Sequence, residues 1–328
     1  MTRSVDIRAD RDLALLTLER GQSADVRVEA AETLCELAFD APADLRPEFE
    51  PAVVRLLADK QDEVRCAGLA LASEVLAPAE AKDILIRHLG DKVPRVRVEA
   101  AGRLADLAIP EARGALAAAL EDPALTVRFE AARGMAALQH PAGLPVLLEA
   151  LNDVDLRFRA ASALAQLGNK DAIAPLKRAF SSWFVPAFDK TQMAGALAAL
   201  GDADGIAHLF KRAGGRKWTM DRAMAIELLG AVKAPGAVPR LLEVLKDADD
   251  PARGTAARAL GRFGDPTVET ALADMLASSD ATDDLKLDAA EGLLLLQTPS
   301  ARARVSALKL QDELAAEELA ALLEDYAP

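Results

Sequence analysis

One motif recurs nine times along this chain, and a fixed internal period constrains the fold more than any single residue does. Clear copies include RVRVEAAGRLADLA from Arg95 and TVRFEAARGMAALQ from Thr126. Each copy has a basic anchor near its start, and the mean spacing of the anchors is about 32 residues. The anchors are Arg27, Arg65, Arg97, Arg128, Arg157, Lys190, Arg222, Arg253 and Lys286. The sequence therefore predicts an array of similar units.

Small and apolar residues after each anchor mark one face of an α-helix. They fall at offsets 3, 4, 7 and 10, as in Ala100, Ala101, Leu104 and Leu107, which is the spacing of one helical face. A second, more variable helix is predicted before each of these, often with proline near its start. A single helical pair cannot bury its apolar face alone, so the pairs are expected to stack. The fold class is therefore all-α.

The units are expected to form a single domain over residues 1–328. Hairpins are predicted at about 5–38, 47–77, 79–108, 110–139, 141–168, 170–201, 203–232, 234–264 and 265–297, with a C-terminal cap at 299–325. The closing segment, residues 312–325, is amphipathic and acidic. It is interpreted as a cap over the last apolar face; the alternative is a detachable regulatory helix.

Further marks within the units resemble HEAT repeats, especially the short bacterial HEAT-like kind found in bilin lyases. A proline lies inside four of the first helices, where it is expected to kink them: Pro51, Pro145, Pro175 and Pro239. An arginine or lysine often follows an aspartate by six residues, as in Asp59/Arg65 and Asp91/Arg97. The resemblance implies a right-handed, armadillo-like α-solenoid of about nine HEAT-like hairpins with helical caps. It also implies a ladder of Asp/Arg pairs along the edge where the two helices of each hairpin are joined.

Charge and composition exclude several classes of function. The formal net charge is −13, which argues against binding nucleic acid or anionic lipid over the whole surface. The charged start lacks a secretion signal and no apolar run is long enough to span a membrane, so we expect a cytoplasmic protein. Cys35 and Cys66 lie among apolar neighbours in predicted helices and are interpreted as small core residues.

Signals for catalysis are weak. His88, His140 and His208 lie in three separate repeats, and none has a cysteine or carboxylate at metal-ligand spacing. No glycine-rich phosphate loop or nucleophile elbow is present. We therefore expect neither an enzyme nor a bound cofactor or metal.

The repeat pattern breaks in the sixth and seventh units, and such a break is a candidate functional site. Trp183 and Arg216 occupy the places where aspartate is expected, and six of the twelve aromatic residues lie between positions 180 and 218. Residues 169–222 also carry nine basic and five acidic groups. The predicted partner-binding edge comprises Trp183, Phe184, Phe188, Lys190, Arg216, Lys217 and Trp218. The alternative is that Phe180, Phe184 and Phe188 pack under the loop as a satellite core.

A second candidate surface is the concave groove lined by the second helices. Its predicted residues change sign along the chain: Glu29, Glu32, Glu36, Glu74, Glu99, Asp106, Glu130, Arg159, Arg258 and Arg262. A groove of this kind would orient a partner of complementary charge. The alternative is an ordinary solvated helix face.

These observations predict a non-catalytic scaffold or adaptor that binds protein partners on the acidic groove and the aromatic edge. Two alternatives remain. The basic segment 170–222 is compatible with nucleic-acid binding, since some HEAT-like proteins resemble DNA-repair glycosylases. A role like that of the bilin lyases is the other.

Overall fold

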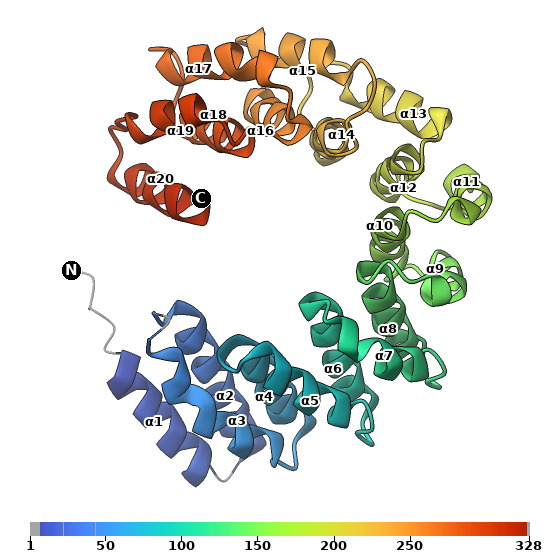
Figure 1. Ribbon diagram of the computed structural model, residues 1–328, viewed down its shortest axis with the longest axis vertical. Coiled ribbons are helices and arrows are strands. Elements are labelled where there is room, and N and C mark those ends of the chain that lie inside the picture. The colour runs from blue at the N-terminus through green and yellow to red at the C-terminus, as the bar shows by residue number, and fades with distance from the viewer. Residues whose placement is uncertain (1–6, 22, 43, 327–328) are drawn as a thin grey trace. The chain divides into compact units, whose positions relative to one another are not determined.

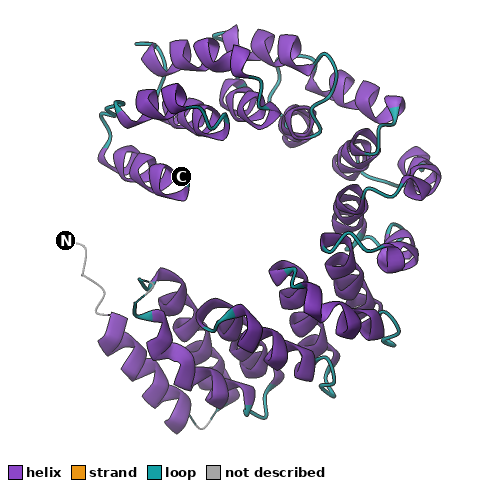
Figure 2. Cartoon of the chain, viewed as in Figure 1, coloured by secondary structure: helices purple, strands orange, loops and turns teal. Residues whose placement is uncertain are grey.

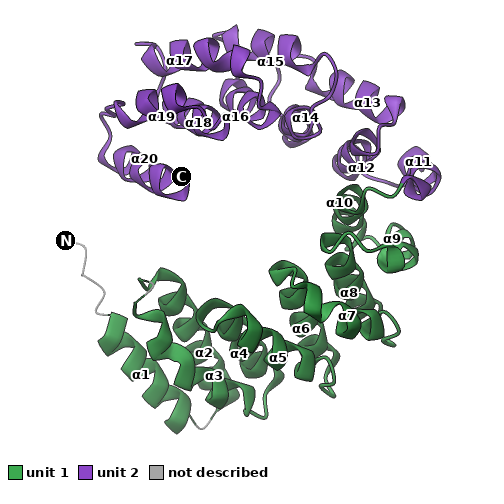
Figure 3. Cartoon of the chain, viewed as in Figure 1, with its two compact units in different colours: residues 1–169 green, residues 170–328 purple. Residues whose placement is uncertain are grey.

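The structure is a computed structural model that describes residues 7–21, 23–42 and 44–326; the parts of the predicted first hairpin at residues 5, 6 and 22 lie outside these ranges. Its described residues form helices and connecting loops with no strand (Figure 2), which confirms the all-α prediction. Contacts divide the chain into two compact units, residues 1–169 and residues 170–328 (Figure 3). That the units form one domain stays a prediction.

The first unit contains five helical hairpins. Its helices are α1 (Ile7–Arg20), α2 (Ala24–Asp40), α3 (Glu50–Leu57), α4 (Asp62–Val75), α5 (Pro78–His88), α6 (Pro94–Leu107), α7 (Arg113–Ala119), α8 (Leu125–Ala137), α9 (Leu144–Ala150) and α10 (Arg157–Leu167). Even-numbered helices pack directly on one another from α2 to α10 (Figure 1). Each odd-numbered helix packs on the following one. The even-numbered helices are the predicted second helices.

The second unit contains four hairpins and two closing helices. Its helices are α11 (Ile173–Ser181), α12 (Ala187–Ala199), α13 (Ala203–Ala213), α14 (Met220–Ala231), α15 (Ala237–Lys246), α16 (Arg253–Phe263), α17 (Glu269–Ala277), α18 (Asp283–Leu295), α19 (Pro299–Ser306) and α20 (Glu313–Asp325). The second helices again form a continuous layer, from α12 to α18. The described residues therefore contain nine hairpins, as predicted, and closing helices.

Small residues allow the second helices to approach closely. Gly261 on α16 faces Gly292 on α18 so closely that a Cβ at either position would meet the backbone of the other helix. Ala256, Ala257 and Leu260 on the same face of α16 are fully buried. The periodic small and apolar residues of the sequence are thus the packing contacts of the layer.

The prolines of the first helices mark junctions rather than kinks. Pro51 and Pro145 are each the second residue of an α-helix that follows a short 3₁₀ helix, at Arg46–Phe49 and Pro141–Gly143 respectively. Proline is tolerated there because first-turn N–H groups have no helical acceptor. The predicted single helix is therefore divided into a 3₁₀ turn and an α-helix.

The Asp/Arg pairs link each repeat to the next one. Arg65 donates two hydrogen bonds to the carboxylate of Asp91, with N–O distances of 3.0 and 3.1 Å, and a third to the backbone carbonyl of Asp59. Arg97 binds Asp122 in the same way, at 2.7 and 2.9 Å. The expected ladder is present, but its rungs join consecutive hairpins. The aspartates six residues before Arg65 and Arg97 each contribute a backbone carbonyl oxygen instead.

The first three rungs of the ladder share one register relative to the second helices. Their donors Arg27, Arg65 and Arg97 are the fourth residues of α2, α4 and α6. The acceptors of the ladder lie three residues before the start of the next second helix, and they are Asp59, Asp91, Asp122 and Asp250. Among the described residues of the second unit, Arg222, the third residue of α14, forms a similar rung with Asp250 at 2.6 and 2.8 Å, and both side chains are buried.

The C-terminal helix α20 covers the end of the second unit. Ala315 and Leu319 are buried against the core that runs from α12 to α20. Arg302 on α19 donates to the backbone carbonyl of Leu323 at 3.2 Å, and Asp283 on α18 accepts hydrogen bonds from the N–H groups of Gln311 and Asp312. In this arrangement α20 has the contacts of a cap.

The buried rung supports a first prediction. Asp250→Asn should lower the free energy of unfolding by about 3 kcal/mol, because it leaves the buried guanidinium of Arg222 without its counter-charge. The control Glu63→Gln breaks the exposed pair between Arg95 and Glu63, whose N–O distance is 2.5 Å, and should cost less than about 1 kcal/mol. Urea denaturation followed by circular dichroism measures both. Equal losses of unfolding free energy in the two variants would show that the buried rung contributes no more to stability than an exposed ion pair does.

The pH dependence of the same rung gives a second prediction. Burial alone would raise the pKa of Asp250, but hydrogen bonds from Arg222 and from the N–H of Ala252 outweigh it and hold that pKa below its usual value. A depressed folded pKa contributes stability above the unfolded value of about 4 that is lost as the pH falls through the folded pKa. The stability difference between the wild-type chain and Asp250→Asn should therefore be constant from pH 7 to pH 5 and shrink below about pH 4. A difference that grows in acid would contradict this assignment.

Candidate functional site

Two successive interhelical loops of the second unit form the candidate edge. One loop, residues 182–186, joins α11 to α12, and the other, residues 214–219, joins α13 to α14. Helix α13 packs on both α12 and α14, and these two also pack on each other. The loops therefore hold equivalent positions in neighbouring hairpins. We call this surface, with Trp183, Phe184, Phe188, Lys190, Arg216, Lys217 and Trp218, the aromatic edge.

The aromatic rings of this edge are exposed. Trp183 is 81% exposed and Phe184 71%, and their rings stack with centroids 3.8 Å apart at an interplanar angle of 30°. Trp218 is 50% exposed, and Phe188 is also exposed. The satellite-core alternative is correct only for Phe180, which packs on the core and contacts His208 edge-on at 5.0 Å.

Positive charge at the edge is only partly neutralised. Arg216 pairs with Asp247 on the next repeat at 2.7 Å, and Arg212 pairs with Asp221 at 3.1 Å. In contrast, the ammonium groups of Lys190, Lys211 and Lys217 make no ion pair with any described residue. The edge thus combines exposed rings with uncompensated positive charge.

The environment of His208 shows that this charge converges between α12 and α13. Burial lowers the pKa of His208 below its usual value, and the positive charges of Arg212, Lys211 and Lys190 lower it further. Its Nε2 atom is buried and has no hydrogen-bond partner among the described residues. Asp221 also faces His208 and opposes this shift, but it is paired with Arg212.

The register of the ladder locates the break in the repeat pattern. Lys190 is the fourth residue of α12, so it holds the donor position of the ladder. Three residues before α14 lies Lys217, and three residues before α12 lies Phe184. Phe184 and Lys217 therefore occupy the acceptor positions that aspartate holds in the intact rungs. The sequence pattern assigned these positions to Trp183 and Arg216. Each predicted aspartate position was one residue too early, because the basic anchors do not all lie at the same position within their helices.

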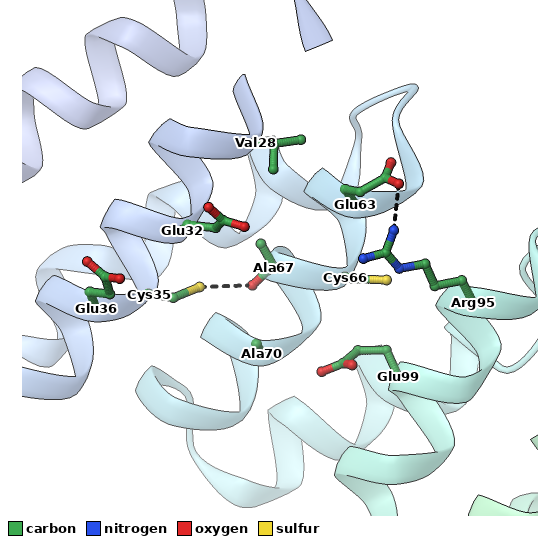
Figure 4. A pocket seen from close by; sticks show the side chains of 10 residues that line it. All are labelled: Val28, Glu32, Cys35, Glu36, Glu63, Cys66, Ala67, Ala70, Arg95 and Glu99. Carbon is green, nitrogen blue, oxygen red and sulfur yellow. Dashed lines mark hydrogen bonds and ion pairs between the residues drawn. The ribbon is translucent and has the colours of Figure 1, made fainter. Parts of the chain in front are cut away.

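One pocket of the first unit is lined by several residues of the candidate groove. A cavity of about 390 Å³ lies among α2, α4 and α6, and Figure 4 shows the side chains that line it. Its lining residues are Val28, Glu32, Cys35, Glu36, Glu63, Cys66, Ala67, Ala70, Arg95 and Glu99. We call it the acidic pocket. Within the described residues Glu32 and Glu36 make no ion pair, as is also true of Glu29 beside it on α2.

Other predicted groove carboxylates are paired within the chain. Glu74 contacts Arg46 at 3.2 Å, and Glu99 contacts Arg103 at 2.7 Å. Asp106 accepts a hydrogen bond from Arg133 at 2.6 Å.

Glu130 is buried, so the prediction that it faces solvent is wrong. It is only 5% exposed and lies between Arg133, at 2.8 Å, and Arg159, at 2.7 Å. Arg159 also lies over the ring of Phe129, 5.0 Å from its centroid. The position is buried because arginines from two helices converge on it, which one helix's periodicity does not show.

The basic positions of the groove in the second unit are neutralised as well. Arg258 pairs with Glu227 at 3.5 Å and with Asp288. Arg262 pairs with Glu227 at 3.6 Å. The sign change along the sequence therefore reflects ion pairs between neighbouring second helices.

The two cysteines, predicted to be small buried core residues, line the acidic pocket. Both are only partly buried, and burial raises the pKa of each thiol to about 11. The Cys35 thiol donates to the carbonyl of Ala67 at 3.4 Å. They are therefore small, protonated wall residues. Their place at the margin of the apolar helical face was the available signal.

Comparison with known proteins identifies the family. The family model for HEAT repeats matches residues 82–155, 114–186 and 217–294, more than half of the chain. The chain therefore belongs to the HEAT repeat family, whose all-α solenoid fold is commonly a protein-interaction scaffold. No curated protein matches the sequence significantly.

Solved structures with similar folds include yeast importin-β (Kap95p), with 16% identity and a TM-score of 0.55 over 99% of this chain and 52% of that one. The Kap95:Nup1 complex matches with 14% identity and a TM-score of 0.53 over 99% and 51%. The CpcE and CpcF complex of a Nostoc phycocyanin lyase matches with 23% identity and a TM-score of 0.46 over 76% and 95%. The chain spans about half the length of the importin chains, and the likeness is one of fold.

Among the described residues, no group of three histidine, cysteine or carboxylate side chains is placed to hold a metal ion. None of the helices in this part of the chain is long and apolar enough to cross a bilayer.

Proposed function

We propose that this HEAT-repeat protein is a non-catalytic scaffold that captures a protein segment on the aromatic edge of its second unit. The observation that carries the proposal is the exposure of Trp183, Phe184 and Trp218 on equivalent loops of adjacent hairpins. Tryptophan and arginine are the residues most enriched at the energetic centres of protein interfaces.

The rings have little role in holding the fold together. A stacked pair that leaves Trp183 81% exposed buries little apolar area, and burial is the source of an aromatic residue's contribution to stability. Phe180 and Phe210 pack on the core below instead. A partner that covered the exposed rings would gain the burial that the folded chain leaves unused.

The acidic pocket provides a second contact for a basic side chain. Glu32 and Glu36 are free to accept a charge, while Ala67, Ala70 and the protonated thiols supply apolar walls. Lysine and arginine place their methylene stems along such walls and their charged ends on carboxylates. A basic segment of a partner is therefore the chemistry that suits this pocket.

The role of the aromatic edge is tested by the double substitution Trp183→Ala with Trp218→Ala. Capture of partners from native cell extract, quantified by mass spectrometry, should fall at least about tenfold because two anchor rings are lost. The melting temperature should stay within about 2 °C because both rings are exposed.

Phe39→Ala is the matched control, since Phe39 on α2 is also 71% exposed but lies in the other unit. This variant should retain capture. Loss of stability with unchanged capture in the tryptophan variant would instead assign the rings to packing and refute the role of the edge.

The acidic pocket is tested by Glu32→Lys with Glu36→Lys. The double change reverses the two unpaired charges and should weaken binding of a lysine-rich synthetic peptide at least about tenfold. Glu29→Lys with Asp25→Lys reverses two exposed charges of the same helix outside the pocket and should have a smaller effect. Equal effects of the two variants would mean that only the net charge of the unit matters, and fluorescence anisotropy at 150 mM salt distinguishes these outcomes.

A further inference from the structure

We propose that the partner segment at the aromatic edge contributes an aspartate or glutamate whose carboxylate bridges Lys190 and Lys217, completing the rung that this chain lacks. An apolar residue next to that carboxylate would pack on Phe184 and Trp218. This inference rests on the proposed function and specifies the chemistry of the partner.

The first support is the register of the side chains. In each of the rungs formed by Arg27, Arg65 and Arg97, the fourth residue of a second helix reaches an aspartate three residues before the next second helix. Applied to α12 and α14, the same rule pairs Lys190 with Lys217. Two cations thus occupy the donor and acceptor positions of one rung, where their repulsion is unfavourable.

The second support is that nearby acids already have partners. Asp221, on α14 of the next repeat, binds Arg212, and Asp247 binds Arg216. Asp202 and Asp204 both bind Lys177. The chain therefore leaves Lys190 and Lys217 without a carboxylate among its described residues, and an external carboxylate is what the site lacks.

The third support is the neighbouring apolar surface. Phe184 holds the aspartate position of the preceding repeat and is exposed, and Trp218 directly follows Lys217. A segment that places a carboxylate on the two lysines would therefore pass over aromatic rings on at least one side. The combination selects an acidic residue flanked by an aromatic or aliphatic one.

The limited extent of the positive charge favours a peptide over a larger polyanion. The chain carries a net charge of −13, and residues 169–222 have only nine basic groups, several of them already paired. A duplex or an anionic membrane needs many cations spread over a wide face. The two lysines of a single rung are enough to bind a single carboxylate.

The test uses the full chain with a displayed library of random 12-residue peptides and the substitution Lys217→Asp. The substitution supplies an internal acceptor for Lys190, so it should raise the melting temperature by about 1–2 °C and lower the affinity for the selected peptides at least about tenfold. Peptides selected on the wild-type chain should be enriched in aspartate or glutamate beside an aromatic or aliphatic residue.

Lys211→Asp is the matched control, because it makes the same charge change at an exposed position of α13 outside the ladder; it should retain at least half of the affinity. Peptides without acidic enrichment, no enriched peptide at all, or equal losses in the two variants would overturn the proposal. Stronger binding of phosphatidylserine vesicles or of a DNA duplex than of any selected peptide would also overturn it. A tryptophan-dependent but carboxylate-independent interaction would leave the proposed scaffold function standing while refuting this inference.

Discussion

The ion pair between consecutive hairpins is the interaction that sets their register at the junctions α2/α4, α4/α6, α6/α8 and α14/α16. Apolar stacking alone specifies that second helices lie against one another, but it does not fix the position of one helix along the axis of the next. An arginine held by a carbonyl of its own repeat and by the carboxylate of the next fixes both the register of the two hairpins and the conformation of the loop between them. Because the same aspartate also accepts a hydrogen bond from the loop's backbone, one side chain organises three parts of the chain.

This device explains why the break at the sixth and seventh repeats is informative. Removing the aspartate acceptor from a rung lowers the stability of the folded chain unless another interaction replaces it. The chain offers exposed rings and unpaired lysines at that place, and neither stabilises the folded chain. A site that weakens the local rule without a structural gain is the expected signature of binding. In this chain that signature is read against the junctions that keep the rung, those of Arg27, Arg65, Arg97 and Arg222.

The fold was predictable from sequence because, in a repeat protein, the residues that recur along the sequence are the ones that pack between helices. The offsets of Ala100 and Leu104 from Arg97 specify a helical face, and the structure buries that face. The register of the ladder was harder, since loop length varies and Arg222 is the third rather than the fourth residue of its helix. That the aromatic edge is a binding site stays a prediction, and the helix bounds place Lys217, where the sequence pattern placed Arg216, at the acceptor position of the rung.

Burial of Glu130 and the acidic pocket were not predictable for a related reason. Burial of Glu130 depends on side chains from two successive second helices, and the pocket on side chains from three. The period of one helix carries no information on which charges of its neighbours converge.

The central claim is that the interrupted rung is where a partner binds. Hydrogen–deuterium exchange with a bound partner peptide tests it most directly: the account predicts slower exchange confined to residues 182–190 and 214–222. Protection elsewhere in the chain, with these two segments unchanged, would contradict it.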